Sequence, residues 1–128
     1  MKYLLDSDQI IWYLKGKSEV VKRLQNLGRE NLAVSTISIA EVAEGIFGES
    51  EESTRLLALE MFLAEINVLD VTRSIAYEFA RLRSKLRRKG KLLDNFDLLI
   101  AAACLALDLI LVTENKRHFQ RIPNLRLL

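Results

Sequence analysis

A run of four aliphatic residues, LILV at 109–112, constrains the fold of this chain more than any other feature. A strand with one face in water alternates apolar and polar side chains, but this run leaves no polar face. It therefore predicts a strand covered on both faces, as strands are in the parallel sheets of α/β proteins. Two other short apolar segments, KYLL at 2–5 and residues 32–34, predict further strands of the same kind.

Apolar residues recur at helical spacing between these strands. We expect an early helix that ends at Gly16 and another helix capped by Ser38, with Glu41 in capping-box spacing after it. The other expected helices cover residues 18–27, 51–65, 72–89 and about 94–107, with a helical turn at 115–120. Short extended segments are expected at 67–71 and 125–127. Strands that alternate with helices predict a parallel sheet flanked by helices on both faces.

The size and composition fit one folded domain over residues 1–128, since domains commonly hold about 100–150 residues. Half of the residues are hydrophobic, which favours a packed core over disorder. A net charge of +2 does not by itself indicate nucleic-acid binding. The longest apolar stretch ends before Asp108 and is shorter than the roughly 20 residues that span a bilayer. We therefore expect a cytoplasmic protein with no membrane association.

Two residue types occur only once, and both limit the chemistry. The single cysteine, Cys104, excludes an intrachain disulfide and a cysteine zinc cluster. The single histidine, His118, excludes a multi-histidine metal site and argues against a histidine-based triad. Because His118 stands in a polar segment, we expect it to be solvated.

Oxygen-bearing side chains should gather at one edge of the predicted sheet. Asp6 follows the first strand and Asn115 follows the LILV strand, while Glu41 and Asp97 lie early in two helices. Sites in open parallel sheets form beyond the carboxyl ends of the strands. Crowded carboxylates repel one another unless a cation lies between them, and oxygen donors suit Mg²⁺ or Mn²⁺. Taken singly, Asp6 could be a helix cap and Glu41 the second half of a capping box.

Four segments carry a family resemblance. They are LLDSDQIIWYLKG, VSTISIAEVAEGIFG, GKLLDNFDLLIAAACLA and LILVTENKRHFQRIPNLRL. In this order they resemble the successive motifs of PIN-domain nucleases, most of all the VapC-type toxins of toxin–antitoxin pairs. The four segments are spread over almost the whole chain, from residue 4 to residue 127. The resemblance implies a PIN-like three-layer α/β domain with a central parallel sheet.

The same resemblance implies an activity and a site. It implies a metal-dependent endoribonuclease, the toxin of a type II toxin–antitoxin system, that forms a homodimer and binds a cognate antitoxin. Asp6, Glu41 and Asp97 would hold Mg²⁺ or Mn²⁺. Many relatives have a fourth acid where this chain has Asn115, which can orient a ligand but brings no charge.

Two further acids stand beside the expected ligands. Asp94 precedes Asp97 by three residues, and we expect it to be the N-cap of a helix that begins at Asn95. Asp8 could equally be a supporting residue of the metal site or a helix cap.

A basic run and two aromatic residues are candidate contacts for partners. RLRSKLRRKGK, residues 81–91, holds seven of the 19 basic residues and no acid. On a helix Arg81, Lys85 and Arg88 share a face that could contact RNA phosphates, although a solvated face is the alternative. Trp12 and Phe62 could line a groove for an antitoxin helix, or could pack in the core.

Two other functions remain open. One is a housekeeping RNA-processing nuclease of the same fold that has no antitoxin. The other is a degenerate module that binds RNA or a partner without cutting, which the neutral Asn115 keeps open. The RNA target cannot be read from the sequence, because selectivity depends on RNA shape and single-stranded context.

Overall fold

The computed structural model describes all 128 residues and contains one parallel sheet. Its strands are β1 (Tyr3–Leu5), β2 (Leu32–Ser35), β3 (Asn67–Leu69) and β4 (Ile110–Val112). They lie in the order β3-β2-β1-β4, and each neighbouring pair is parallel. Residues 125–127 add only an isolated bridge between Leu127 and Leu111. The expected parallel α/β sheet is confirmed.

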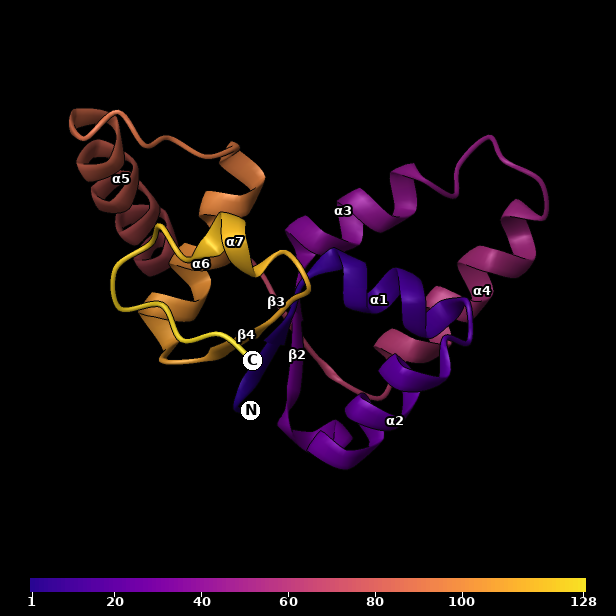
Figure 1. Ribbon diagram of the computed structural model, residues 1–128. Helices are drawn as coiled ribbons and strands as arrows, with labels where there is room; N and C mark the ends of the chain where they lie inside the picture. The colour runs from indigo at the N-terminus through magenta and orange to yellow at the C-terminus, as the bar shows by residue number, and fades with distance from the viewer.

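Helices cover the sheet in two layers (Figure 1). One layer holds α1 (Ser7–Leu14), α2 (Ser18–Leu27), α3 (Thr36–Glu44) and α4 (Glu52–Leu63). The other layer holds α5 (Arg73–Arg88), α6 (Asn95–Leu107) and the short α7 (Lys116–Phe119). A 3₁₀ turn, Arg29–Asn31, leads into β2. None of these helices combines the length and the apolar character that crossing a membrane requires.

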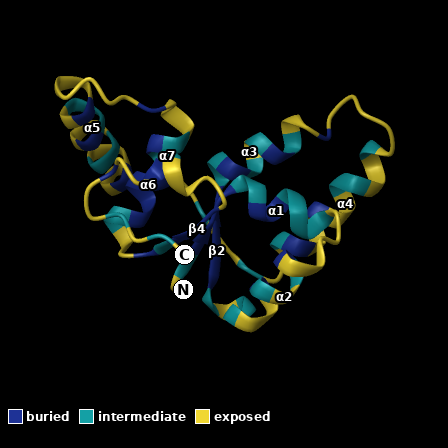
Figure 2. Ribbon diagram, viewed as in Figure 1, coloured by how far each residue is buried: buried dark blue, intermediate teal, exposed yellow.

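Strands β1, β2 and β4 supply side chains to two separate cores, because neighbouring residues of a strand point to opposite faces. Leu4 and Leu111 join the core beneath α5 and α6, whereas Leu5 and Val112 join the core beneath α1 to α4. Figure 2 shows the buried strands between helices whose outer faces are exposed. The small residues 101–104 of α6 are all buried, as predicted for a helix that packs closely on a sheet.

The helix starts correct one prediction and confirm another. Ser35 caps α3, since its hydroxyl accepts a hydrogen bond from the backbone N–H of Ile37 at 3.1 Å. Ser38, the expected cap, lies inside the helix and is fully buried. The capping box of Ser38 and Glu41 is therefore wrong. Asp94 caps α6 as expected, accepting from the N–H of Phe96 at 3.1 Å.

Candidate functional site

Asp6 lies at the carboxyl end of β1, where its side chain is held by two donors. The backbone N–H of Ser7 donates to Oδ1 at 2.8 Å, and the Thr113 hydroxyl donates to Oδ2 at 2.8 Å. Asp6 is only 6% exposed, and this burial raises its pKa to about 6, against the opposing effect of the Thr113 hydrogen bond. The negative charges of Asp8 and Asp97 add to the rise. Asp6 therefore caps α1 and also contributes a carboxylate to the sheet edge.

Glu41, on the sixth position of α3, faces the same edge from the layer of α1 to α4. The pKa of Glu41 is raised to about 7, mainly by partial burial and also by the charges of Asp6, Asp97 and Asp94. The pKa of Glu41 responds to Asp6 and Asp97 because the three carboxylates lie near one another. The structure thus brings together the three acids expected from the sequence.

Asp97, the third residue of α6, comes from the opposite layer. Burial raises the pKa of Asp97. The electrostatic interaction with His118 lowers this pKa, and the negative charge of Asp94 raises it. His118 Nδ1 lies 3.2 Å from Asp97 Oδ2. His118 is 32% exposed, so it is partly solvated as expected but also lies beside a site carboxylate, which the sequence pattern did not predict. Its position three residues after Asn115, one helical turn along α7, is the sequence signal that could have placed it near the site.

The segment that follows β4 supplies polar groups around these acids. Thr113 is fully buried, and its hydroxyl also accepts a hydrogen bond from the backbone N–H of Asn115 at 3.0 Å. Asn115 Nδ2 lies 3.1 Å from His118 Nδ1. Asn115 thus lies beside the site as expected, but it adds an amide and not a fourth carboxylate.

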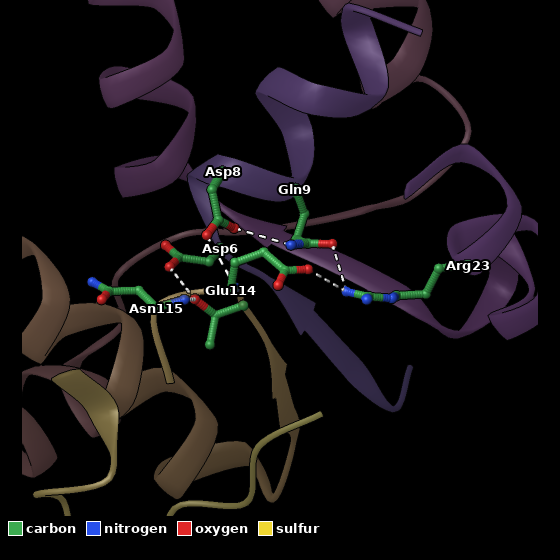
Figure 3. A network of polar contacts seen from close by, with 7 residues as sticks. Asp6, Asp8, Gln9, Arg23, Glu114 and Asn115 are labelled. Atoms are coloured by element: carbon green, nitrogen blue, oxygen red, sulfur yellow. Dashed lines mark hydrogen bonds and ion pairs between the residues drawn. The ribbon is translucent and has the colours of Figure 1, made fainter. Parts of the chain in front are cut away.

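A second polar network ties this segment to α1 and α2 (Figure 3). Asp8 Oδ2 accepts from the backbone N–H of Glu114 at 3.1 Å, and Asp8 Oδ1 accepts from Gln9 Nε2 at 3.2 Å. Arg23 Nη1 donates to Glu114 Oε1 at 2.9 Å and lies 3.4 Å from Gln9 Oε1. Gln9 is fully buried. Asp8 therefore anchors the segment after β4 and does not cap α1.

The donor chemistry of the three acids fits a hard divalent cation. Carboxylate oxygens are the ligands that Mg²⁺ and Mn²⁺ prefer, and burial together with neighbouring acids raises the pKa of all three carboxyl groups. No three acidic, histidine or cysteine side chains already converge closely enough to hold an ion. Like charges keep carboxylates apart, and a cation would draw them together.

The basic residues expected to contact RNA all lie exposed on α5. Arg81 pairs with Glu78, and Arg88 Nη2 donates to the Ser84 hydroxyl at 3.0 Å. Arg83 Nε donates to Asn95 Oδ1 at 3.1 Å, which ties α5 to the first residue of α6. The basic face therefore lies on the layer that carries Asp97.

The two aromatic candidates differ in burial. Trp12 is half-buried, with Lys17 Nζ 4.0 Å from the centre of its ring. Phe62 is only 6% exposed and lies 4.7 Å from the ring of Tyr13. Nearby, a hollow of about 280 Å³ lies between α1, α3 and α4. It is lined by Ile11, Leu14, Lys15, Glu41, Val42, Gly45, Ile46, Arg55 and Ala58.

Known proteins resemble the chain over its full length. The family model described as the PIN domain matches residues 3–125. Ribonuclease VapC1 of Haemophilus influenzae is 31% identical, covering 98% of this chain and 96% of the relative. The tRNA(fMet)-specific endonuclease VapC of Salmonella typhimurium is 30% identical, covering 99% of this chain and 96% of the relative.

Two solved structures have the same fold and a similar degree of identity. The structure of DNA-bound VapBC from Salmonella typhimurium superposes with a TM-score of 0.93 and 30% identity, covering 100% of this chain and 97% of that one. VapBC2 from Rickettsia felis, bound to a promoter DNA fragment, gives a TM-score of 0.91 and 30% identity, covering 100% and 98%.

Proposed function

Because this chain belongs to the PIN-domain family of VapC ribonucleases, we propose that it is a metal-dependent endoribonuclease and the toxin of a type II toxin–antitoxin pair. One observation carries the proposal. Asp6, Glu41 and Asp97 come from three separate elements and lie near one another at one sheet edge, where each has a raised pKa. Such a set of carboxylates is suited to bind a cation.

The three carboxylates would hold Mg²⁺ or Mn²⁺ between them. When bound, such an ion lowers the pKa of a water and stabilises negative charge on the phosphate under attack. The protein's own contribution is to aim the ligands. Thr113 and the N–H of Ser7 fix the carboxylate of Asp6, while Asn115 offers an uncharged amide beside them. No separate side-chain base is required.

The RNA would run from the acids toward α5. Arg81, Lys85 and Arg88 are exposed, and α5 is tied to the start of α6, two residues before Asp97. Cationic side chains in this position favour phosphate contacts that fix the strand without reading its sequence. Because RNA is the substrate, we place the protein's action in the cytoplasm.

We also propose that the protein forms a homodimer and is inhibited by a cognate antitoxin. The relatives of known structure include VapBC assemblies. On this chain Trp12 would contact the antitoxin directly, and the buried Phe62 would support that surface from below. Replacing Trp12 by Ala should then weaken the antitoxin complex more than it slows cleavage. Phe62→Ala should also lower the free energy of unfolding by about 3–5 kcal/mol, because it empties a core position. The melting temperature of this variant should fall accordingly.

Cleavage by the purified protein tests the proposed activity. RNA should be cut at internal positions when Mg²⁺ or Mn²⁺ is present, and cutting should stop when a chelator is added. Cleavage that continues undiminished in chelator would overturn the metal mechanism. Sequencing of RNA ends after induction in cells would then identify the target.

Two alternative functions have their own tests. A protein that binds RNA in Mg²⁺ but never cuts it would be the non-cleaving module, which the neutral Asn115 favours. A nuclease with no antitoxin gene beside its own would be an RNA-processing enzyme.

A further inference from the structure

The two aspartates of the site are held to different degrees. Both oxygens of Asp6 accept hydrogen bonds, one from Ser7 N–H and one from Thr113. Asp97 sits in the first turn of α6, where its side chain has one nitrogen partner, His118 Nδ1 at 3.2 Å from Oδ2. His118 is therefore the group that can fix which way the Asp97 carboxylate points.

The proton on the imidazole can be assigned from its neighbours. His118 Nδ1 lies close to both Asp97 Oδ2 and Asn115 Nδ2. A carboxylate only accepts, so a bare Nδ1 would set two lone pairs against each other across the short contact to Asp97. With the proton on Nδ1, the ring presents its N–H toward Asp97 Oδ2, 3.2 Å away, and a half-turn of the Asn115 amide presents its oxygen to the same N–H.

The position of His118 is set by its neighbour in α7. Phe119 is fully buried in the core beneath α5 and α6, so this short turn is anchored. The His118 ring is tilted by 56° against the Phe119 ring, with centroids 6.1 Å apart. The anchored Phe119 thus keeps the backbone of His118 beside the site.

We propose that His118 is a positioning residue of the metal centre. Its imidazole presents Nδ1–H to Asp97 Oδ2, 3.2 Å away, and leaves the other carboxylate oxygen free to face the cation. This inference rests on the proposed function. It means that one segment, residues 113–118, aims both aspartates, Asp6 through Thr113 and Asp97 through His118.

The role follows from the way metal ligands are usually supported. Groups that hydrogen-bond to a ligand carboxylate fix its orientation, and removing them typically weakens metal binding about 10- to 100-fold. In this chain Asn115 brings no charge to the site, and His118 lets the segment after β4 act on the metal by orienting Asp97.

Three substitutions of His118 separate this role from others. Asn places its Nδ2 at the same number of bonds from Cβ as histidine Nδ1, Gln places its amide one atom further out, and Ala removes the donor. Calorimetric titration with Mn²⁺ should give about tenfold weaker binding for His118→Ala and His118→Gln. His118→Asn should recover most of the affinity. Thermal stabilisation by Mn²⁺ should follow the same order.

Cleavage rates complete the test. The Ala variant should cut slowly at low Mn²⁺ and approach the parental rate at saturating Mn²⁺. Unchanged Mn²⁺ affinity in His118→Ala, or no recovery in His118→Asn, would overturn the proposal. A rate deficit that persists at saturating Mn²⁺ would also overturn it, because His118 would then act on the substrate itself. A parent protein that neither binds Mn²⁺ nor cuts RNA would refute the proposed function instead.

Discussion

The two helical layers differ in what they expose around the site. The layer of α1 to α4 brings Glu41 and a mostly apolar hollow of about 280 Å³ that begins beside it. The layer of α5 to α7 brings Asp97 and His118, together with the basic face of α5. Asp6 comes from the sheet between the two layers. An apolar surface suits a protein partner and a basic one suits RNA.

This division shows why the acidic centre depends on both cores. Glu41 is positioned by the core that contains Leu5, and Asp97 by the core that contains Leu4, although these two leucines are adjacent in β1. The strand β1 lies between these two cores, and α3 also packs directly against α6, so both contacts set the relative position of the two carboxylates. The two layers can bind different partners, but each must supply one carboxylate to the proposed cation site.

The largest expected effect tests whether both layers supply a ligand to the cation. Asp97→Asn and Glu41→Gln, one from each layer, should each lower cleavage about 100-fold or more, since a bound metal contributes several kcal/mol to transition-state stabilisation. The matched control is Asp94→Ala, three residues from Asp97. It removes a helix cap and should lower the unfolding free energy by about 0.5–2 kcal/mol while cleavage persists.

Cleavage assays and melting curves on the same three variants give the answer. If Asp94→Ala loses activity while Asp97→Asn keeps it, the ligand of α6 has been assigned to the wrong residue. If Glu41→Gln remains active, the site belongs to the sheet and the α5 to α7 layer alone.

A second prediction concerns the metal-free protein, in which both layers hold uncompensated charge. The pKa values of Asp6 (about 6) and Glu41 (about 7) lie above their ordinary values of 3.8 and 4.5. A carboxylate with a raised folded-state pKa stabilises the fold at low pH, and that stability is lost as pH rises through the folded-state value. In chelator the protein should therefore be more stable near pH 4 than near pH 8, with Asp6 contributing about 3 kcal/mol.

Melting temperatures measured in chelator across this range check the sign. Mg²⁺ should reduce or reverse the slope, because it binds the ionised form. Asp6→Asn should flatten the slope in chelator. A metal-free protein that becomes more stable from pH 4 to pH 8 would show that the acids are already compensated.

The parts of this site that the sequence could predict are those set by local pattern. Asp6 directly follows an apolar run, so the pattern predicts it at the end of a strand. Asp97 follows a helix cap by three residues, so the pattern predicts it in the first turn of a helix. The contacts that orient them were harder to predict. Arg23 meets Glu114 across 91 residues of sequence, and no spacing rule encodes such a pair.

Local rules also failed where two of them competed. Ser38 and Glu41 have capping-box spacing, but Ser35 begins α3 one turn earlier because β2 ends there. His118 stands in a polar segment, yet the burial of Phe119 carries it against Asp97. In both cases the sheet and its core overrode a pattern read from a few residues.

A third prediction concerns the exposed charge of the α5 layer. Replacing Arg81, Lys85 and Arg88 by Gln should weaken RNA binding and flatten its salt dependence by up to about three units of slope, because fewer counterions are released. Folding should change little, since all three residues are exposed. The control replaces Lys2, Lys17 and Lys22, which are exposed outside α5, and loses the same net charge. Equal changes in the two triple variants would mean that only net charge matters.

The smallest expected effect concerns two exposed ion pairs. Arg23–Glu114, at 2.9 Å, ties α2 to the segment that holds Thr113 and His118. Arg126–Asp108, at 2.8 Å, is the matched control, because Asp108 precedes β4 and so stands at the opposite end of that strand from the site. The Arg23–Glu114 side chains are 36% and 40% exposed, so we expect a coupling free energy of about 0.2–1 kcal/mol in a double-mutant cycle, and no more for the control.

Cleavage should separate the two pairs where stability does not. Arg23→Gln should slow cleavage by up to about fivefold, the equivalent of about 1 kcal/mol, and Glu114→Gln should add little to that loss because the two residues act through one contact. Arg126→Gln should leave the rate unchanged at a temperature where all variants are folded. The measurement is a double-mutant cycle on the cleavage rate at fixed Mn²⁺. Additive effects of Arg23→Gln and Glu114→Gln would show that this ion pair does not hold the segment after β4. The orientation of Asp6 and Asp97 would then depend only on the other contacts of that segment, namely Thr113, His118 and the backbone contact to Asp8.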